Sequence, residues 1–113
     1  MIELQLIEKS QIVKHYSVFD FKQGGNYYYF KAQLELRDGS HLMIRIFMSE
    51  DEYNYSFHWQ DVNNNLIIRW DNSPHHKEIS TFPHHKHIRG ATEPSKEISL
   101  KEVMSYIEKQ IMF

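Results

Sequence analysis

Apolar residues recur at every second position in three successive stretches of this chain, and this pattern limits the fold more than any other feature. Apolar side chains occupy every second position in Ser40–Met48, Tyr53–Gln60 and Leu66–Asp71. A period of two is typical of half-buried β-strands, because successive side chains of a strand point to opposite faces. The pair Asp38-Gly39 precedes the first stretch, and it is a strong signal of a β-hairpin. The pattern therefore predicts adjacent antiparallel strands.

Two earlier segments, Ile12–Phe21 and Tyr27–Arg37, also indicate strands, and Gly24-Gly25 lies in the turn between them. Five strands joined by short polar turns describe an antiparallel meander. At the other end of the chain, apolar residues from Leu100 to Ile111 follow helical spacing. We therefore predict an α+β fold: a single domain over residues 1–113 with a meander sheet of about five to six strands, covered on one face by a C-terminal helix. The first ten residues fit either a short helix or an edge strand.

Composition excludes several classes of protein. The chain has no cysteine, which excludes disulfide scaffolds, thiolate zinc sites, iron–sulfur clusters and cysteine nucleophiles. No stretch approaches about 18 apolar residues, and the N-terminus lacks a basic region followed by an apolar one. We expect a cytoplasmic protein without a membrane partner. The net charge of −2 also argues against a uniformly basic nucleic-acid binder.

The predicted uncovered face of the sheet carries an unusual set of polar residues. Arg45, His58, Arg69 and Asp71 fall on this face of three consecutive strands. A solvated sheet face is the ordinary interpretation, whereas two arginines and a histidine favour anion recognition, since the guanidinium group matches phosphate geometry. Asp71 fits either a turn cap that accepts backbone hydrogen bonds or a carboxylate that orients a histidine. Trp59 and Trp70 fall on the predicted core side.

Five of the eight histidines lie between positions 75 and 87. Two Pro-His-His sequences contain most of them: Pro74-His75-His76 and Pro83-His84-His85, the second followed by Lys86 and His87. Three interpretations remain open. The histidines could bind a transition metal, because imidazole is a common ligand and His85 and His87 would share a face in an extended segment. They could instead carry protons in metal-independent RNA cleavage. They could also have only a structural role and pack a proline-rich loop. No Asp or Glu stands at a familiar metalloenzyme spacing, so we expect no metal and no cofactor.

Three sequence runs carry a resemblance to a known family. They are YNYSFHWQD (53–61), LIIRWDNSPHH (66–76) and TFPHHKH (81–87). In these runs the chain resembles the TumE-type toxins, small single-domain proteins formerly grouped as a domain of unknown function. The similarity extends from about Tyr27 to Ile107.

The resemblance implies a toxin of a type II toxin–antitoxin pair, neutralised by a cognate antitoxin of the helix-turn-helix type. For such a toxin we predict a metal-independent endoribonuclease acting on RNA, free or on the ribosome. Histidines would be its acid and base, cationic groups would bind phosphate, and Asp71 would orient a histidine. The candidate catalytic residues are His58, His75, His76, His84, His85 and His87, and the candidate phosphate-binding residues are Arg45, Arg69 and Lys86. Within this set, we expect His58 and either His84 or His85 to be the proton-transfer pair.

Two other classes of function stay open on the sequence. The sheet and its histidine segment also fit a non-catalytic module that binds protein or nucleic acid, or a histidine-ligated metal-binding protein. An exposed edge strand in a small open sheet makes a homodimer plausible.

Overall fold

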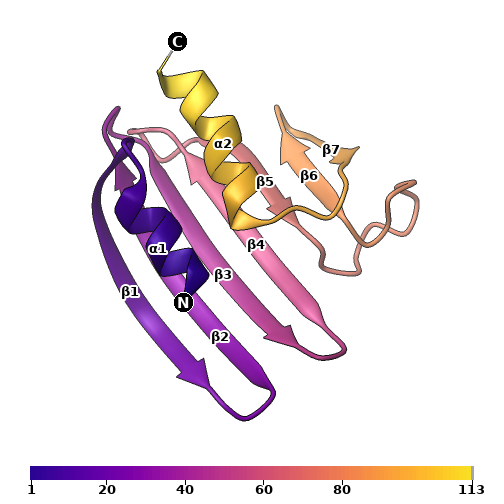
Figure 1. Ribbon diagram of the computed structural model, residues 1–113. Coiled ribbons are helices and arrows are strands. Elements are labelled where there is room, and N and C mark those ends of the chain that lie inside the picture. Colours follow the sequence, from indigo (N-terminus) through magenta and orange to yellow (C-terminus); the bar gives the residue numbers. More distant parts are fainter. Residues whose placement is uncertain (113) are drawn as a thin grey trace.

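The computed structural model describes residues 1–112 as one antiparallel sheet with two helices (Figure 1). The elements in chain order are α1 (Ile2–Lys9), β1 (Val13–Gln23), β2 (Tyr27–Leu36), β3 (His41–Ser49), β4 (Tyr53–Gln60), β5 (Leu66–Asp71), β6 (His85–Ile88), β7 (Ala91–Pro94) and α2 (Leu100–Ile111). Each strand pairs with the next one in the sequence, so the spatial order is β1 to β7. The predicted α+β meander is confirmed.

The sheet extends further than the sequence pattern indicates. The sequence predicts about five to six strands, whereas residues 72–95 contain both β6 and β7 and bring the sheet to seven strands. A tight turn joins these two strands, in which Arg89 and Gly90 have φ of 53° and 76°. Positive φ at both central residues matches the right-handed twist of paired strands. The N-terminal residues, undecided from the sequence, form α1.

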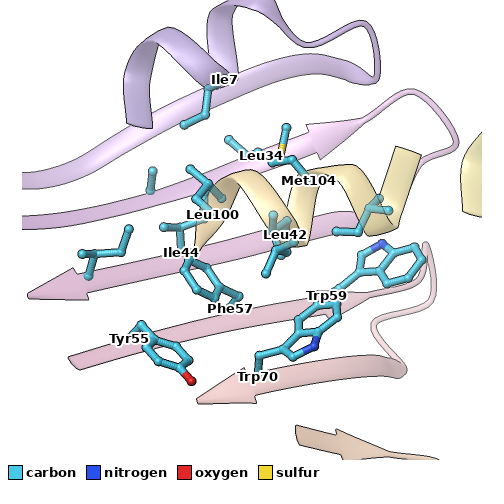
Figure 2. Packing of buried hydrophobic residues seen from close by; sticks show 14 of the residues in the cluster. Ile7, Leu34, Leu42, Ile44, Tyr55, Phe57, Trp59, Trp70, Leu100 and Met104 are labelled. Carbon is cyan, nitrogen blue, oxygen red and sulfur yellow. The ribbon is translucent and has the colours of Figure 1, made fainter. Parts of the chain in front are cut away.

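The core lies between the helices and one face of the sheet, as Figure 2 shows. Leu42 and Ile44 of β3, Phe57 of β4 and Trp70 of β5 point to this face, and all are at most 4% exposed. Leu100 and Met104 of α2 pack over them (Figure 2). Both tryptophans belong to the core, as predicted. Burial of this apolar face is the main contribution to stability.

Helix α2 begins at a capping box. The Glu102 backbone N–H donates to the Ser99 hydroxyl, and the Glu102 side chain accepts from the Ser99 backbone N–H. This reciprocal arrangement satisfies two N–H groups that a helix N-terminus leaves without partners. The capping box also fixes where α2 begins to cover the sheet, because Leu100 directly follows the cap and is buried. Both helices lie on the same side of the sheet (Figure 1), and we call the opposite side the open face.

Candidate functional site

Strand register brings the polar residues of the open face together in two adjacent rows. In the first row Arg45 pairs with Ser56, Ser56 with Asp71, and Asp71 with His85. In the second row Met43 pairs with His58, His58 with Arg69, and Arg69 with His87. Paired residues of neighbouring strands point to the same face. The predicted shared face of Arg45, His58, Arg69 and Asp71 is therefore confirmed, and β6 adds two histidines to it.

Asp71 lies at the centre of this arrangement and is only 4% exposed. Its Oδ1 accepts hydrogen bonds from the Ser73 backbone N–H (3.0 Å) and hydroxyl (2.8 Å), and its Oδ2 accepts one from Arg69 Nε (3.1 Å). Burial by itself raises the pKa of a carboxyl group, but the Ser73 hydrogen bonds, His85 and Arg69 outweigh it and lower the pKa of Asp71. The carboxylate is thus ionised at neutral pH. Asp71 caps the turn, as one sequence interpretation predicts, and it also lies within 3.5 Å of His85 and His87.

His85 is buried beside this carboxylate at 1% exposure. Its Nδ1 lies 2.9 Å from the Pro83 carbonyl oxygen, and because a carbonyl only accepts hydrogen bonds, Nδ1 carries the proton. Its Nε2 lies 2.9 Å from Asp71 Oδ1, but the contact lacks hydrogen-bond geometry and leaves Nε2 without a partner. A buried nitrogen in this state costs free energy unless another group satisfies it.

His87 and His76 complete a group of three imidazoles around His85, which we call the histidine cluster (His76, His85 and His87). The ring centroids are 4.8 to 5.5 Å apart, and one ring nitrogen from each residue lies within 4.8 Å of the others. His87 Nε2 is also 3.5 Å from Asp71 Oδ2. Burial lowers the pKa of His87; Asp71 opposes this shift, while the neighbouring histidines and Arg69 add to it. These nitrogens are the ones in the described part of the chain that could hold a metal ion.

His58 lies on the other side of Arg69 from His87, with Arg69 between the two histidines in the second row. Burial and the adjacent Arg69 cation lower the pKa of His58, and a hydrogen bond with Gln60 partly opposes the shift. The imidazole is therefore neutral at pH 7, which is the state a general base requires.

Two hollows of about 350 and 330 Å³ adjoin on the open face and share Arg45, Ser56 and Arg69 in their linings. The first is also lined by His58 and Lys31. We call the two together the open-face trough. Aromatic side chains line it as well, namely Phe19 in the first hollow and Tyr29 and Phe47 in the second. Cations interleaved with aromatic rings provide phosphate contacts and surfaces on which bases stack.

The remaining sequence candidates lie elsewhere. Lys86 pairs with Trp70, so it shares the helix-covered face rather than the open face. His84 stacks on Tyr55, a core residue, and its Nδ1 lies 2.9 Å from the Tyr55 hydroxyl. His75 is exposed in the segment between β5 and β6. The structure thus places His58, His76, His85, His87, Arg45, Arg69 and Asp71 on or beside the open face, and places His75, His84 and Lys86 elsewhere.

The sequence reasoning missed the trough residues of β2 and β3. Lys31, Tyr29 and Phe47 lie on the same face as Arg45 because they alternate with the buried Phe30 and Ile46. The alternation of Ser40–Met48 already places Phe47 on the face of Arg45, and extending it to Tyr27–Arg37 predicts the direction of Tyr29 and Lys31. The run of aromatic residues in β2 hid the alternation, because both faces of that strand are apolar near its start.

Comparison with family models gives a match over nearly the whole chain. The family model described as Toxin TumE matches residues 3–111. No curated protein and no solved structure matches the chain. Within residues 1–112, no helix is both long enough and apolar enough to cross a membrane.

Proposed function

The chain belongs to the TumE toxin family, and we propose that it is an endoribonuclease toxin that cleaves RNA on its open face by metal-independent acid–base catalysis. The observation that carries this proposal is the row His58–Arg69–His87, in register across β4, β5 and β6. Two imidazoles flank one guanidinium group there. This is the set of groups that RNA cleavage by the internal 2′-hydroxyl requires.

The spacing of the row suits in-line attack on a phosphodiester. Neighbouring strands are about 4.8 Å apart, so the backbones of His58 and His87 stand about 10 Å apart across Arg69. In an in-line displacement the attacking and leaving oxygens lie about 4 Å apart, and a hydrogen bond of about 2.8 Å at each end places base and acid up to about 9–10 Å apart. A phosphate held by Arg69 would therefore lie between the two histidines.

Each group then has one role. Neutral His58 accepts the proton of the 2′-hydroxyl as the 2′-oxygen attacks phosphorus. The bond from phosphorus to the 5′-oxygen breaks, and His87 as imidazolium donates a proton to that oxygen. Burial, the neighbouring histidines and Arg69 lower the pKa of His87, and ionised Asp71, 3.5 Å from His87 Nε2, opposes that shift and favours the charged form. Arg69 and Arg45 offset the negative charge on the phosphate. The products are a 2′,3′-cyclic phosphate and a 5′-hydroxyl.

The trough supplies a means of binding single-stranded RNA. Phe19, Tyr29 and Phe47 offer ring faces to bases, and Lys31 lies beside Arg45 in the strand pairing. Stacking does not depend on base identity, so this surface fits a toxin that acts on many messages, free or on the ribosome. A cognate antitoxin, expected to be a helix-turn-helix protein, is the partner that neutralises such a toxin.

The test is cleavage of a labelled single-stranded RNA by purified protein in excess chelator, with a separate reaction on ribosomes in a magnesium-containing translation extract. We expect cleavage by the wild type, and a loss of about 10²–10⁴-fold in His58→Ala and His87→Ala. His15→Ala, at an exposed histidine on the far edge strand β1, is the matched control. Binding of intact RNA without cleavage in either setting would instead support a non-catalytic binding module.

A further inference from the structure

We infer that the histidine cluster is a binding site for a divalent transition-metal ion, and that zinc fits it best. One nitrogen from each of His76, His85 and His87 lies within 4.8 Å of the others. Neutral imidazole is the commonest nitrogen ligand of such metals, and three histidines with one further position form a known zinc donor set.

The outer contacts of the three rings assign the ligand atom. The Nδ1 of each ring meets an oxygen outside the cluster: Pro83 O for His85 at 2.9 Å, Thr92 Oγ1 for His87 at 3.3 Å, and Glu78 Oε1 for His76 at 3.4 Å. Metal-bound histidines are typically fixed in this way, with the distal ring nitrogen held by a carbonyl, hydroxyl or carboxylate. The Nε2 atoms are therefore the ones left to bind an ion.

The surroundings of His85 Nε2 require a positive charge. This nitrogen is buried without a hydrogen-bond partner, and with the proton on Nδ1 its lone pair lies 2.9 Å from the ionised Asp71. Two electron pairs at that distance repel each other, and a proton or a metal cation between them removes the repulsion. Asp71 Oδ2 is 3.5 Å from His87 Nε2 as well, so one carboxylate can balance the charge of the ion or be its fourth ligand.

The distances agree with a tetrahedral site. Ligand atoms about 2.0–2.1 Å from zinc are about 3.3 Å from one another, and the contacts of 2.9 and 3.5 Å between Asp71 and the two β6 histidines lie on either side of that value. The three imidazole nitrogens, within 4.8 Å, have to approach one another by up to about 1.5 Å. His76 can make this movement because it lies in the irregular segment between β5 and β6, with its side chain 32% exposed.

Metal binding has a consequence for activity that rests on the proposed function, whereas the binding itself does not. Zinc on His87 Nε2 would occupy the electron pair that has to exchange a proton. The zinc-loaded protein is then inactive as a ribonuclease, and the metal-free protein is active.

The experiment uses protein without a histidine tag, stripped of metal and titrated with zinc against a chromogenic chelator. We expect one zinc ion per chain and an affinity reduced about 100-fold or more in His76→Ala, which alters a partly exposed residue and leaves the buried His85 in place. Thr92→Val, which removes only the outer partner of His87, should weaken binding about 10-fold. His15→Ala should bind zinc like the wild type. Cobalt in place of zinc should give the visible absorption bands of a tetrahedral site.

Binding of less than one zinc ion per chain, or a zinc affinity that His76→Ala leaves unchanged, would contradict the proposed metal site. RNA cleavage is measured on the same samples, so the two proposals fail separately. Absence of cleavage by the metal-free protein with zinc binding intact contradicts only the ribonuclease. Cleavage that continues with one zinc bound contradicts only the inhibitory consequence.

Discussion

Asp71 organises the open face because one buried carboxylate is shared by several neighbours. Ser73 and Arg69 donate hydrogen bonds to it, and the Nε2 atoms of His85 and His87 lie 2.9 and 3.5 Å from its oxygens. A buried charge is tolerated only when it is paired and hydrogen-bonded. The hydrogen bonds from Ser73 and Arg69 therefore keep Asp71 ionised beside two histidines.

Asp71→Asn is expected to lower both activity and stability. The amide keeps the shape of the carboxylate but loses the charge that stabilises protonated His87, so cleavage should fall by about 10²-fold or more. The loss of charged hydrogen bonds should lower the free energy of unfolding by about 1–3 kcal/mol. Cleavage rates and urea unfolding measure the two effects, with Asp51→Asn on an exposed turn as the control. If Asp71→Asn cleaved RNA at the wild-type rate, Asp71 would have no role in catalysis.

His58 is expected to titrate below its ordinary range. Its pKa is lowered by burial and by Arg69, so the neutral base predominates until the pH falls below about 6.5. The acid limb of the kcat/KM profile should therefore lie below pH 6.5. In an NMR titration of the metal-free protein, Arg69→Gln should raise the pKa of His58, because a repelling cation is removed. A pKa of His58 that does not respond to Arg69→Gln would contradict this assignment.

The spacing of the histidines in the sequence does not determine which of them lie on the open face. His84, His85, Lys86 and His87 are consecutive, so their directions depend on whether the segment is extended and where its strand begins. Pairing of β6 with β5 places His85 and His87 beside Asp71 and Arg69, and directs Lys86 to the other face. The shared face of His85 and His87 was predictable for an extended segment. Their contact with Asp71 was not, because it depends on pairing across an irregular connection.

At the scale of elements, the alternating strands were predictable and the short ones were not. The predicted strands Tyr53–Gln60 and Leu66–Asp71 coincide with β4 and β5. Strand β6 has four residues, two of them histidines, and β7 ends at a proline, so neither has the β-branched and aromatic composition that marks a strand. Both form because β5 offers an unpaired edge and a tight turn returns the chain.

Ser99→Ala is expected to separate stability from chemistry. Loss of the cap on α2 should lower the free energy of unfolding by about 1 kcal/mol. The site lies on the opposite face of the sheet, so cleavage per folded molecule should be unchanged. Thermal unfolding and cleavage at a temperature well below the midpoint measure the two quantities, with Ser105→Ala on the exposed side of α2 as the control. An equal loss of stability in both variants would show that the cap contributes nothing.

At the scale of the whole molecule, charge is distributed unevenly. The chain has a net charge of −2, yet three cationic residues, Lys31, Arg45 and Arg69, line the open-face trough. Local concentration of positive charge on one face permits RNA binding by a protein that is acidic overall. The rest of the surface attracts RNA only weakly, so RNA binding is limited to the trough.

RNA affinity should therefore depend only moderately on salt. Three phosphate contacts to a single strand predict a slope of about −2 in a plot of log affinity against log salt concentration. Lys31→Gln should reduce the slope by about 0.7, whereas Lys109→Gln on α2 should leave it unchanged. An RNA with 2′-deoxy linkages, which cannot be cleaved, is the ligand for this titration. Equal effects of the two substitutions would place RNA outside the trough.

The most direct measurement on the central proposal is the chemical identity of the RNA ends produced in excess chelator. Attack by the 2′-hydroxyl with His58 and His87 as base and acid predicts 2′,3′-cyclic phosphate and 5′-hydroxyl ends, and no cleavage at a 2′-deoxy linkage. Products with 3′-hydroxyl and 5′-phosphate ends would contradict this mechanism, and so would loss of cleavage when the chelator is added. Such a result would make the histidine cluster a catalytic metal centre.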